Sequence, residues 1–198
     1  LLDTRIGMPL TKIRLNQFSR ISLDQYTTLV MVSGSYNQLR DSDIEKIKDW
    51  VGKGNTLITI ARGSSWAINK KIVDESLVKG KKDTVFSRKN YVDARENIGR
   101  ERIGGVILSV DLDLTHPLAF GYNDLSIPVY KNNNVFINKT SDHYSSVAIY
   151  SEDAHIDGYI SKNNLKNFIP GSASLLVSRI NSGRVVLFAD NPNFRGSW

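Results

Sequence analysis

The chain has 198 residues, of which 40% are hydrophobic and 23% charged, with no cysteine and a net charge of +6. This length predicts a single domain, residues 1–198, whose core is large enough to fold without cross-links. The absence of cysteine excludes a disulfide scaffold, a thiolate zinc site and a cysteine nucleophile in this chain. No apolar run approaches the ~18 residues of a membrane helix, so no membrane partner is expected.

The positive charge is concentrated in one segment. Residues 62–102 contain eleven Lys and Arg against six acids, which is +5 of the total. Proteins that bind nucleic acid combine basic stripes with interleaved aromatic residues or a groove-reading helix. This segment has only three aromatic residues and no such motif, so we expect a solvated basic face and no nucleic-acid partner.

The first half of the sequence alternates predicted strands and helices. Apolar runs at residues 28–32 and 56–60 predict two buried strands. Between them, Ser42 or Asp41 is expected to cap a helix. The apolar face of this helix, at helical spacing, consists of Ile44, Ile47, Trp50 and Val51. Residues 61–65 then turn sharply into another helix, and this alternation is typical of a parallel sheet.

The second half is richer in strands. Residues 73–103 are charged and poorly periodic, and we expect an inserted excursion there. After a strand at 104–110, five short strand patterns follow from Ile127 onward, separated by Asn, Gly and Ser turns. The last strand, 184–189, leads into the polar loop 190–196. We expect the strands at 29–32, 56–60 and 185–188 to be adjacent, central and parallel.

Several segments resemble known families. The Ser33-Gly34-Ser35-Tyr36 turn and the strip at 46–58 (KIKDWVGKGNTLI) resemble class I glutamine amidotransferases. Residues 2–10, 50–58, 115–122 and 183–198 are similar to the C-terminal region of large bacterial zinc-carboxypeptidase-like proteins of peptidase family M14, most specifically FADNPNFRGSW at the end. This resemblance implies a flavodoxin-like, mostly parallel sheet with helices on both faces and a strand-rich second half.

The same resemblance implies an accessory role. It implies that the chain is part of a longer, exported (periplasmic or extracellular) metallopeptidase. The first residues lack both an initiator Met and a signal-peptide pattern, so we expect the chain to be a fragment of that protein. The implied partner is the peptidase domain of the same polypeptide. Zinc is expected in that domain, and no cofactor or metal is expected here, because this chain has no His-x-x-Glu pair and no closely spaced histidines.

Comparison with active amidotransferases predicts a dead nucleophile position. In that family the second strand leads into a Gly-Ile-Cys-x-Gly elbow, and the matching residues 59–63 place Ala61 where the cysteine stands. The family's histidine follows the last strand in a His-Pro-Glu pattern, whereas residues 189–193 contain no histidine. A methyl group cannot attack a carbonyl, so we expect no catalytic residue in this chain.

Two alternatives stay open. In the first, Ser64 or Ser65 at the elbow serves a hydrolase, although no histidine occupies an elbow-facing position of the family and both serines suit turns and helix caps. In the second, the strand ends form a pocket for a small anion, a peptide or a carbohydrate. Its candidate residues are Arg62, Ser64, Ser65, Asp190, Asn191, Asn193 and Arg195. A structural interpretation competes with this pocket: Asp190 and Arg195 pair with each other and lock the loop.

Overall fold

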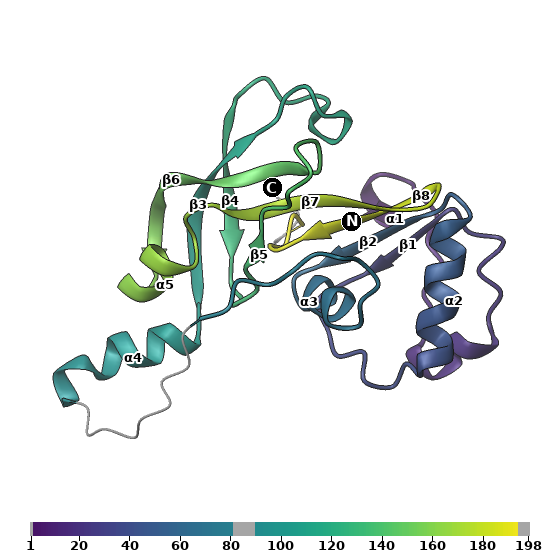
Figure 1. Ribbon diagram of the computed structural model, residues 1–198, viewed down its shortest axis with the longest axis horizontal. Helices are drawn as coiled ribbons and strands as arrows, with labels where there is room; N and C mark the ends of the chain where they lie inside the picture. Colours follow the sequence, from purple (N-terminus) through teal and green to yellow (C-terminus); the bar gives the residue numbers. More distant parts are fainter. Residues whose placement is uncertain (1, 81–89, 194–198) are drawn as a thin grey trace.

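The computed structural model describes residues 2–80 and 90–193, except for the side chains of residues 2, 100 and 101. Its helical elements are α1 (Leu2–Arg5), η1 (Leu15–Arg20), α2 (Asp41–Gly52), α3 (Arg62–Asn69), η2 (Tyr91–Asp93), α4 (Ala94–Glu101), η3 (Pro117–Ala119) and α5 (Lys162–Asn167). Its strands are β1 (Thr28–Met31), β2 (Thr56–Ile60), β3 (Gly105–Leu112), β4 (Ser126–Lys131), β5 (Ile137–Asn138), β6 (Ser146–Tyr159), β7 (Ser172–Ile180) and β8 (Gly183–Phe188). They form one sheet in the order β1-β2-β8-β7-β6-β3-β4, with β5 paired to β7 (Figure 1).

The sheet is mixed, which corrects the expectation of a mostly parallel one. β1, β2 and β8 are parallel neighbours, as predicted, but β1 lies at the edge of the sheet and not at its centre. All other described strand pairs are antiparallel. For β7 and β8 the reason is local: Asn181 and Ser182 form a two-residue turn that pairs Ile180 with Gly183, and a tight hairpin can join only antiparallel strands. The strand-rich second half is confirmed.

The helices α2 and α3 pack on the same face of the parallel end of the sheet. The predicted buried residues of α2 share one core cluster with Trp66 and Ala67 of α3 and with Leu57 and Val185 of the strands. α2 also approaches β8 closely, because a Cβ on Gly183 would overlap the carbonyl oxygen of Val51. Helices were expected on both faces of the sheet. For α2 and α3 this expectation is wrong, because both lie on the same face.

The opposite face of the sheet curls around a cavity of about 440 Å³. Ile58 and Val186 from the parallel end line this cavity together with Val110 of β3 and Val129 of β4. Because β2 and β4 stand far apart in the strand order, they can line one cavity only if the sheet curves. In Figure 1, β3 and β4 rise steeply against β7 and β8. The curled second half, and not a second layer of helices, faces this side of the parallel strands.

The predicted excursion at 73–103 is described on both sides of residues 81–89, which lie outside the described residues. On its first side, Val73 is buried in the core cluster and Leu77 bridges to Ile137. On its second side, α4 projects from the body and contacts α5 (Figure 1). There, the side-chain amide of Asn164 donates to the carbonyl oxygen of Gly99 at 3.1 Å.

Candidate functional site

The turn between β2 and α3 has a strained backbone at Ala61. Its φ of 49° and ψ of −110° lie in a region that L-residues rarely adopt. The turn is held by backbone hydrogen bonds: the N–H of Ala61 donates to the carbonyl oxygen of Phe188 at 2.8 Å, and its own carbonyl accepts from Ser64. A sharp, strained strand-to-helix turn is the geometry that presents a nucleophile in enzymes with an elbow. Here the residue in that place carries a methyl group and is 2% exposed.

The two elbow serines bond to the backbone. Ser64 is fully buried, and its hydroxyl donates to the carbonyl oxygen of Phe188 at 2.7 Å and lies 2.9 Å from the hydroxyl of Thr59. The hydroxyl of Ser65 donates to the carbonyl oxygen of Arg62 at 3.1 Å. A Cβ on Gly63 would lie 2.6 Å from the carbonyl oxygen of Met31, so the elbow also packs tightly against the end of β1. Ser64 thus links α3 to β2 and β8.

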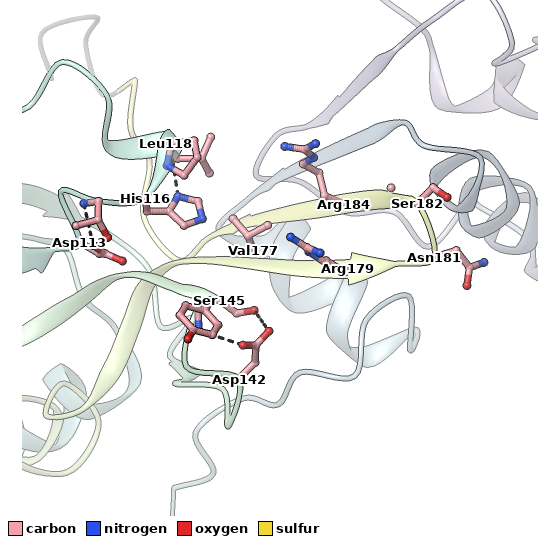
Figure 2. Close-up of a pocket in the computed structure, with 14 residues that line it drawn as sticks. Asp113, His116, Leu118, Asp142, Ser145, Val177, Arg179, Asn181, Ser182 and Arg184 are labelled. Atoms are coloured by element: carbon pink, nitrogen blue, oxygen red, sulfur yellow. Dashed lines mark hydrogen bonds between the residues drawn. The ribbon is translucent and has the colours of Figure 1, made fainter.

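The three histidines lie away from the elbow contacts. Nδ1 of His116 accepts from the N–H of Leu118 at 3.1 Å (Figure 2), and Nε2 of His155 lies 2.7 Å from the carbonyl oxygen of Gly158. His143 is exposed. Within residues 2–80 and 90–193, no group of three or more His, Asp or Glu is placed to hold a metal ion. In the same ranges, no helix has the length and apolarity needed to cross a membrane.

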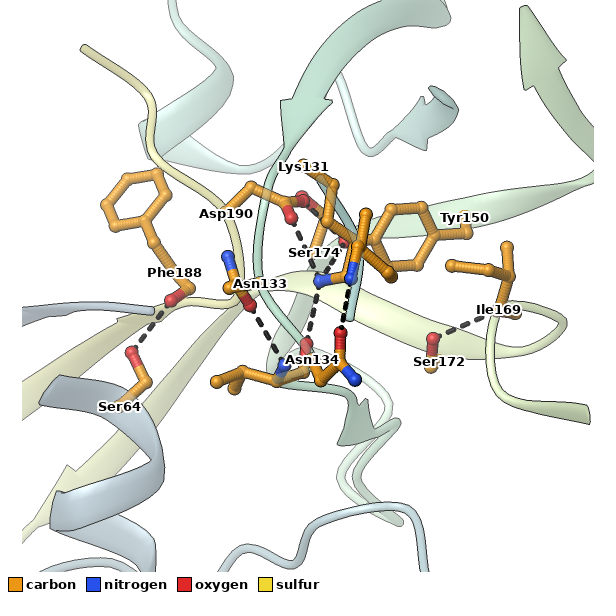
Figure 3. A network of polar contacts seen from close by, with 12 residues as sticks. Ser64, Lys131, Asn133, Asn134, Tyr150, Ile169, Ser172, Ser174, Phe188 and Asp190 are labelled. Atoms are coloured by element: carbon orange, nitrogen blue, oxygen red, sulfur yellow. Dashed lines mark hydrogen bonds and ion pairs between the residues drawn. The ribbon is translucent and has the colours of Figure 1, made fainter. Parts of the chain in front are cut away.

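A buried polar network lies just beyond β8 (Figure 3). One carboxylate oxygen of Asp190 accepts from Nζ of Lys131 at 3.0 Å. The other accepts from the hydroxyls of Tyr150 at 2.5 Å and Ser174 at 2.7 Å. Lys131 also donates to the carbonyl oxygen of Val135 at 2.7 Å and to the Tyr150 hydroxyl at 3.2 Å, so all three of its N–H donors have partners.

Burial dominates the electrostatics of this network. Desolvation lowers the pKa of Lys131, while the charge of Asp190 and its hydrogen bond to the ammonium act in the opposite direction. Desolvation, followed by the charge of Asp190, raises the pKa of Tyr150 well above its ordinary value. The ammonium of Lys131 also lies over the ring of Phe136, 4.8 Å from its centroid. The network therefore holds an ion pair inside the protein with every charged group hydrogen-bonded.

The structure brings together some of the residues predicted for the strand-end pocket. Asp190 and Asn191 line the 440 Å³ cavity. The elbow residues Arg62, Ser64 and Ser65 are not among its lining residues. Asn193 is exposed, and its N–H donates to the side chain of Asn191 at 3.1 Å. Arg195, and with it the predicted Asp190–Arg195 pair, lies outside the described residues.

Sequence reasoning missed the described partners of Asp190. Lys131, Tyr150 and Ser174 lie 59, 40 and 16 positions away from it in the sequence. The one available signal was a lysine closing the predicted strand Ile127-Pro-Val-Tyr-Lys131, where alternation gives its side chain a definite face. That signal marks Lys131 as unusual, but it does not identify the carboxylate that pairs with it.

Comparisons with known proteins support the fold. No protein-family model matches the sequence, and no curated protein matches it. A ThuA-like protein from Bacteroides uniformis has a similar structure with a TM-score of 0.53 and 10% identity, over 96% of this chain and 70% of that one. A ThuA-like protein from Parabacteroides merdae has a TM-score of 0.52 and 9% identity, over 85% and 61%.

A third structure, from Thermoplasma acidophilum and named after one of the subunits of GMP synthase, has a TM-score of 0.48 and 14% identity. The match covers 86% of this chain and 65% of that protein. The two ThuA-like structures show that the fold is mixed α/β and similar to that of ThuA-like proteins. Nothing in the comparisons links the chain to zinc carboxypeptidases.

The strained backbone at Ala61 predicts that glycine at this position stabilises the protein. Replacing alanine by glycine normally destabilises a protein, but a residue held in a rare backbone region stores about 1–3 kcal/mol of strain that glycine relieves. We expect Ala61→Gly to raise the free energy of unfolding by about 1 kcal/mol, measured by urea denaturation. The control is Ala67→Gly in α3, a fully buried alanine, which should lower it by about 1 kcal/mol or more. A comparable loss in both variants would contradict a strained elbow.

The Lys131–Asp190 pair predicts that substitutions of these two residues have strongly coupled effects on the free energy of unfolding. Lys131→Met leaves a buried carboxylate without its cation, and we expect it to cost about 3–5 kcal/mol of unfolding free energy. Lys131→Met combined with Asp190→Asn should cost clearly less than the sum of the single variants, because no uncompensated charge is then buried. The control is Lys48→Met at the surface pair with Glu45, which should change stability by less than about 1 kcal/mol. Additive effects at Lys131 and Asp190 would contradict the pair.

Proposed function

We propose that this chain is a non-catalytic, amidotransferase-like accessory domain. The observation that carries this proposal is Ala61: the backbone of the elbow has the strained geometry of a nucleophile turn, yet its side chain is a methyl group. A methyl group supplies neither a nucleophile nor an acid or base. The elbow serine nearest to it, Ser64, is buried and already donates to the carbonyl oxygen of Phe188.

A more specific form of the proposal, which we call its finer form, concerns a longer protein to which this chain would belong. We infer that the domain accompanies a zinc-carboxypeptidase-like peptidase domain in one exported polypeptide, and that it orients this domain or presents substrate to it. The support is the sequence resemblance at 50–58, 115–122 and 183–198. Any zinc would then belong to the peptidase domain, because the described residues of this chain offer no metal cluster.

The test is a set of hydrolase assays. We expect the purified chain to show no glutaminase, esterase or carboxypeptidase turnover above the blank. Ala61→Cys should gain no glutaminase activity, because no described histidine hydrogen-bonds at the elbow. Turnover that is lost in Ser64→Ala or Ser65→Ala would instead establish the serine-hydrolase alternative.

The native polypeptide, captured with an antibody against this chain, tests the finer form. It should contain zinc and cleave C-terminal residues from peptides. A native polypeptide without zinc and without carboxypeptidase turnover would refute the link to a metallopeptidase, while leaving the non-catalytic nature of this domain intact.

A further inference from the structure

Two adjoining cavities form a groove along the concave face of the sheet. The 440 Å³ cavity described above meets a second cavity of about 720 Å³, and the two share Leu118 and Arg184 as lining residues. We call the two together the concave groove. Pockets for small molecules typically measure about 300–1,000 Å³, so each part is large enough for a ligand.

The two parts of the concave groove differ in chemistry. The smaller part is walled mainly by aliphatic and aromatic side chains from β2, β3, β4, β7 and β8: Ile58, Val110, Leu112, Ile127, Val129, Leu175, Val186 and Phe188. The larger part contains Arg179, Arg184 and His116. An apolar chamber therefore opens onto a chamber with two guanidinium groups and an imidazole, and Arg184 stands where the two meet.

The two arginines form a like-charged pair. Arg179 of β7 lies directly opposite Arg184 of β8 in the strand register, and Figure 2 shows both at this end of the hairpin, near the turn at Asn181 and Ser182. Like charges directly opposite each other on a sheet are destabilising. Neither arginine makes an ion pair with another residue within the described ranges 2–80 and 90–193. An anion between the two guanidinium groups would remove this repulsion.

The carboxylates that line the same chamber are held by their own loops. Asp142 accepts from the N–H of Tyr144 at 3.0 Å and the hydroxyl of Ser145 at 2.7 Å. These bonds lower the pKa of Asp142, and the charge of Arg179 adds to the effect. One oxygen of Asp113 likewise accepts from the N–H and the hydroxyl of Thr115. Both acids are thus engaged in turns, and Arg184 faces the groove without a described carboxylate partner.

The imidazole of His116 adds a hydrogen-bond donor. Its Nδ1 accepts from the N–H of Leu118, so the proton of the neutral ring resides on Nε2. Two guanidinium groups and an imidazole N–H are well suited to a carboxylate, because arginine can bind both of its oxygens at once.

We propose that the concave groove binds an amphipathic carboxylate, with its carboxylate at Arg179 and Arg184 and its apolar body in the 440 Å³ cavity. Of the described residues predicted for the strand-end pocket, Asp190 and Asn191 line the concave groove, whereas Arg62, Ser64 and Ser65 do not, so the anion site proposed here differs from the predicted one. It also goes beyond the proposed accessory role, since it assigns a ligand class to the concave groove.

The test uses decanoate as the probe, titrated into the full chain by calorimetry below its micelle concentration. Decyltrimethylammonium supplies the same apolar chain with the opposite charge, and acetate supplies the carboxylate without the chain. We expect saturable binding of decanoate at one site, with at least tenfold weaker binding of both comparison probes. Arg184→Gln should weaken decanoate at least tenfold. Arg62→Gln is the matched control, and it should leave the affinity unchanged.

A stability measurement distinguishes loss of the binding site in Arg184→Gln from misfolding of the variant. Because Arg184→Gln removes a like-charged neighbour, its melting temperature without ligand should equal or exceed that of the wild type. Absence of decanoate binding to the wild-type chain would overturn the proposal, as would equal binding of the cationic probe or an affinity unchanged by Arg184→Gln. Loss of binding in Arg62→Gln would move the anion site to the elbow. None of these outcomes bears on the hydrolase assays, so the two proposals fail separately.

Discussion

The shape of this molecule is tied to the contact between Lys131 and Asp190. Lys131 closes β4, the last strand in the order of the sheet, and Asp190 follows β8, which is separated from β4 by β7, β6 and β3. A flat sheet would hold these residues several strand spacings apart, since neighbouring strands are about 4.8 Å apart. The 3.0 Å contact between their charged groups therefore requires the sheet to curl. The concave groove is the direct consequence.

At the elbow, a strained strand-to-helix turn carries a methyl group at Ala61. Ala61 is held in a strained conformation by hydrogen bonds to β8 and α3, and Gly63 admits the close approach of β1. In an enzyme this strain presents a nucleophile, and the cost is repaid in catalysis. Here the elbow joins β1, β2, β8 and α3 at one point. The arginine pair lies elsewhere, in the concave groove.

The parts of the fold that depend on local sequence could be predicted. The strands around Leu57 and Val186 follow from apolar runs, and Ile44, Ile47, Trp50 and Val51 are buried as their helical spacing predicts. The start of that helix was predicted less well: Asp43 accepts from the N–H of Arg40, in place of a cap at Ser42 or Asp41. The helix α5, with three asparagines in six residues, gave no periodic signal at all.

The candidate sites depended on contacts that no local pattern encodes. The parallel direction of β8 was predicted, but its antiparallel pairing with β7 was not, so neither the curl nor the pairing of Lys131 with Asp190 was foreseen. For the arginine pair, the sequence does contain a usable signal. Arg179 and Arg184 flank the Asn181-Ser182 turn symmetrically, and recognising that turn as a hairpin would have placed them opposite each other.

Hydrogen exchange of backbone amides in wild type and Lys131→Met tests most directly whether this ion pair holds the curled half of the sheet against the parallel half. The account predicts that amides of β3 and β4 lose protection strongly in the variant, while those of β2 and of α2 keep most of theirs. Protection that falls equally in both halves, or that stays unchanged in β3 and β4, would contradict the claim that the Lys131–Asp190 contact maintains the curl.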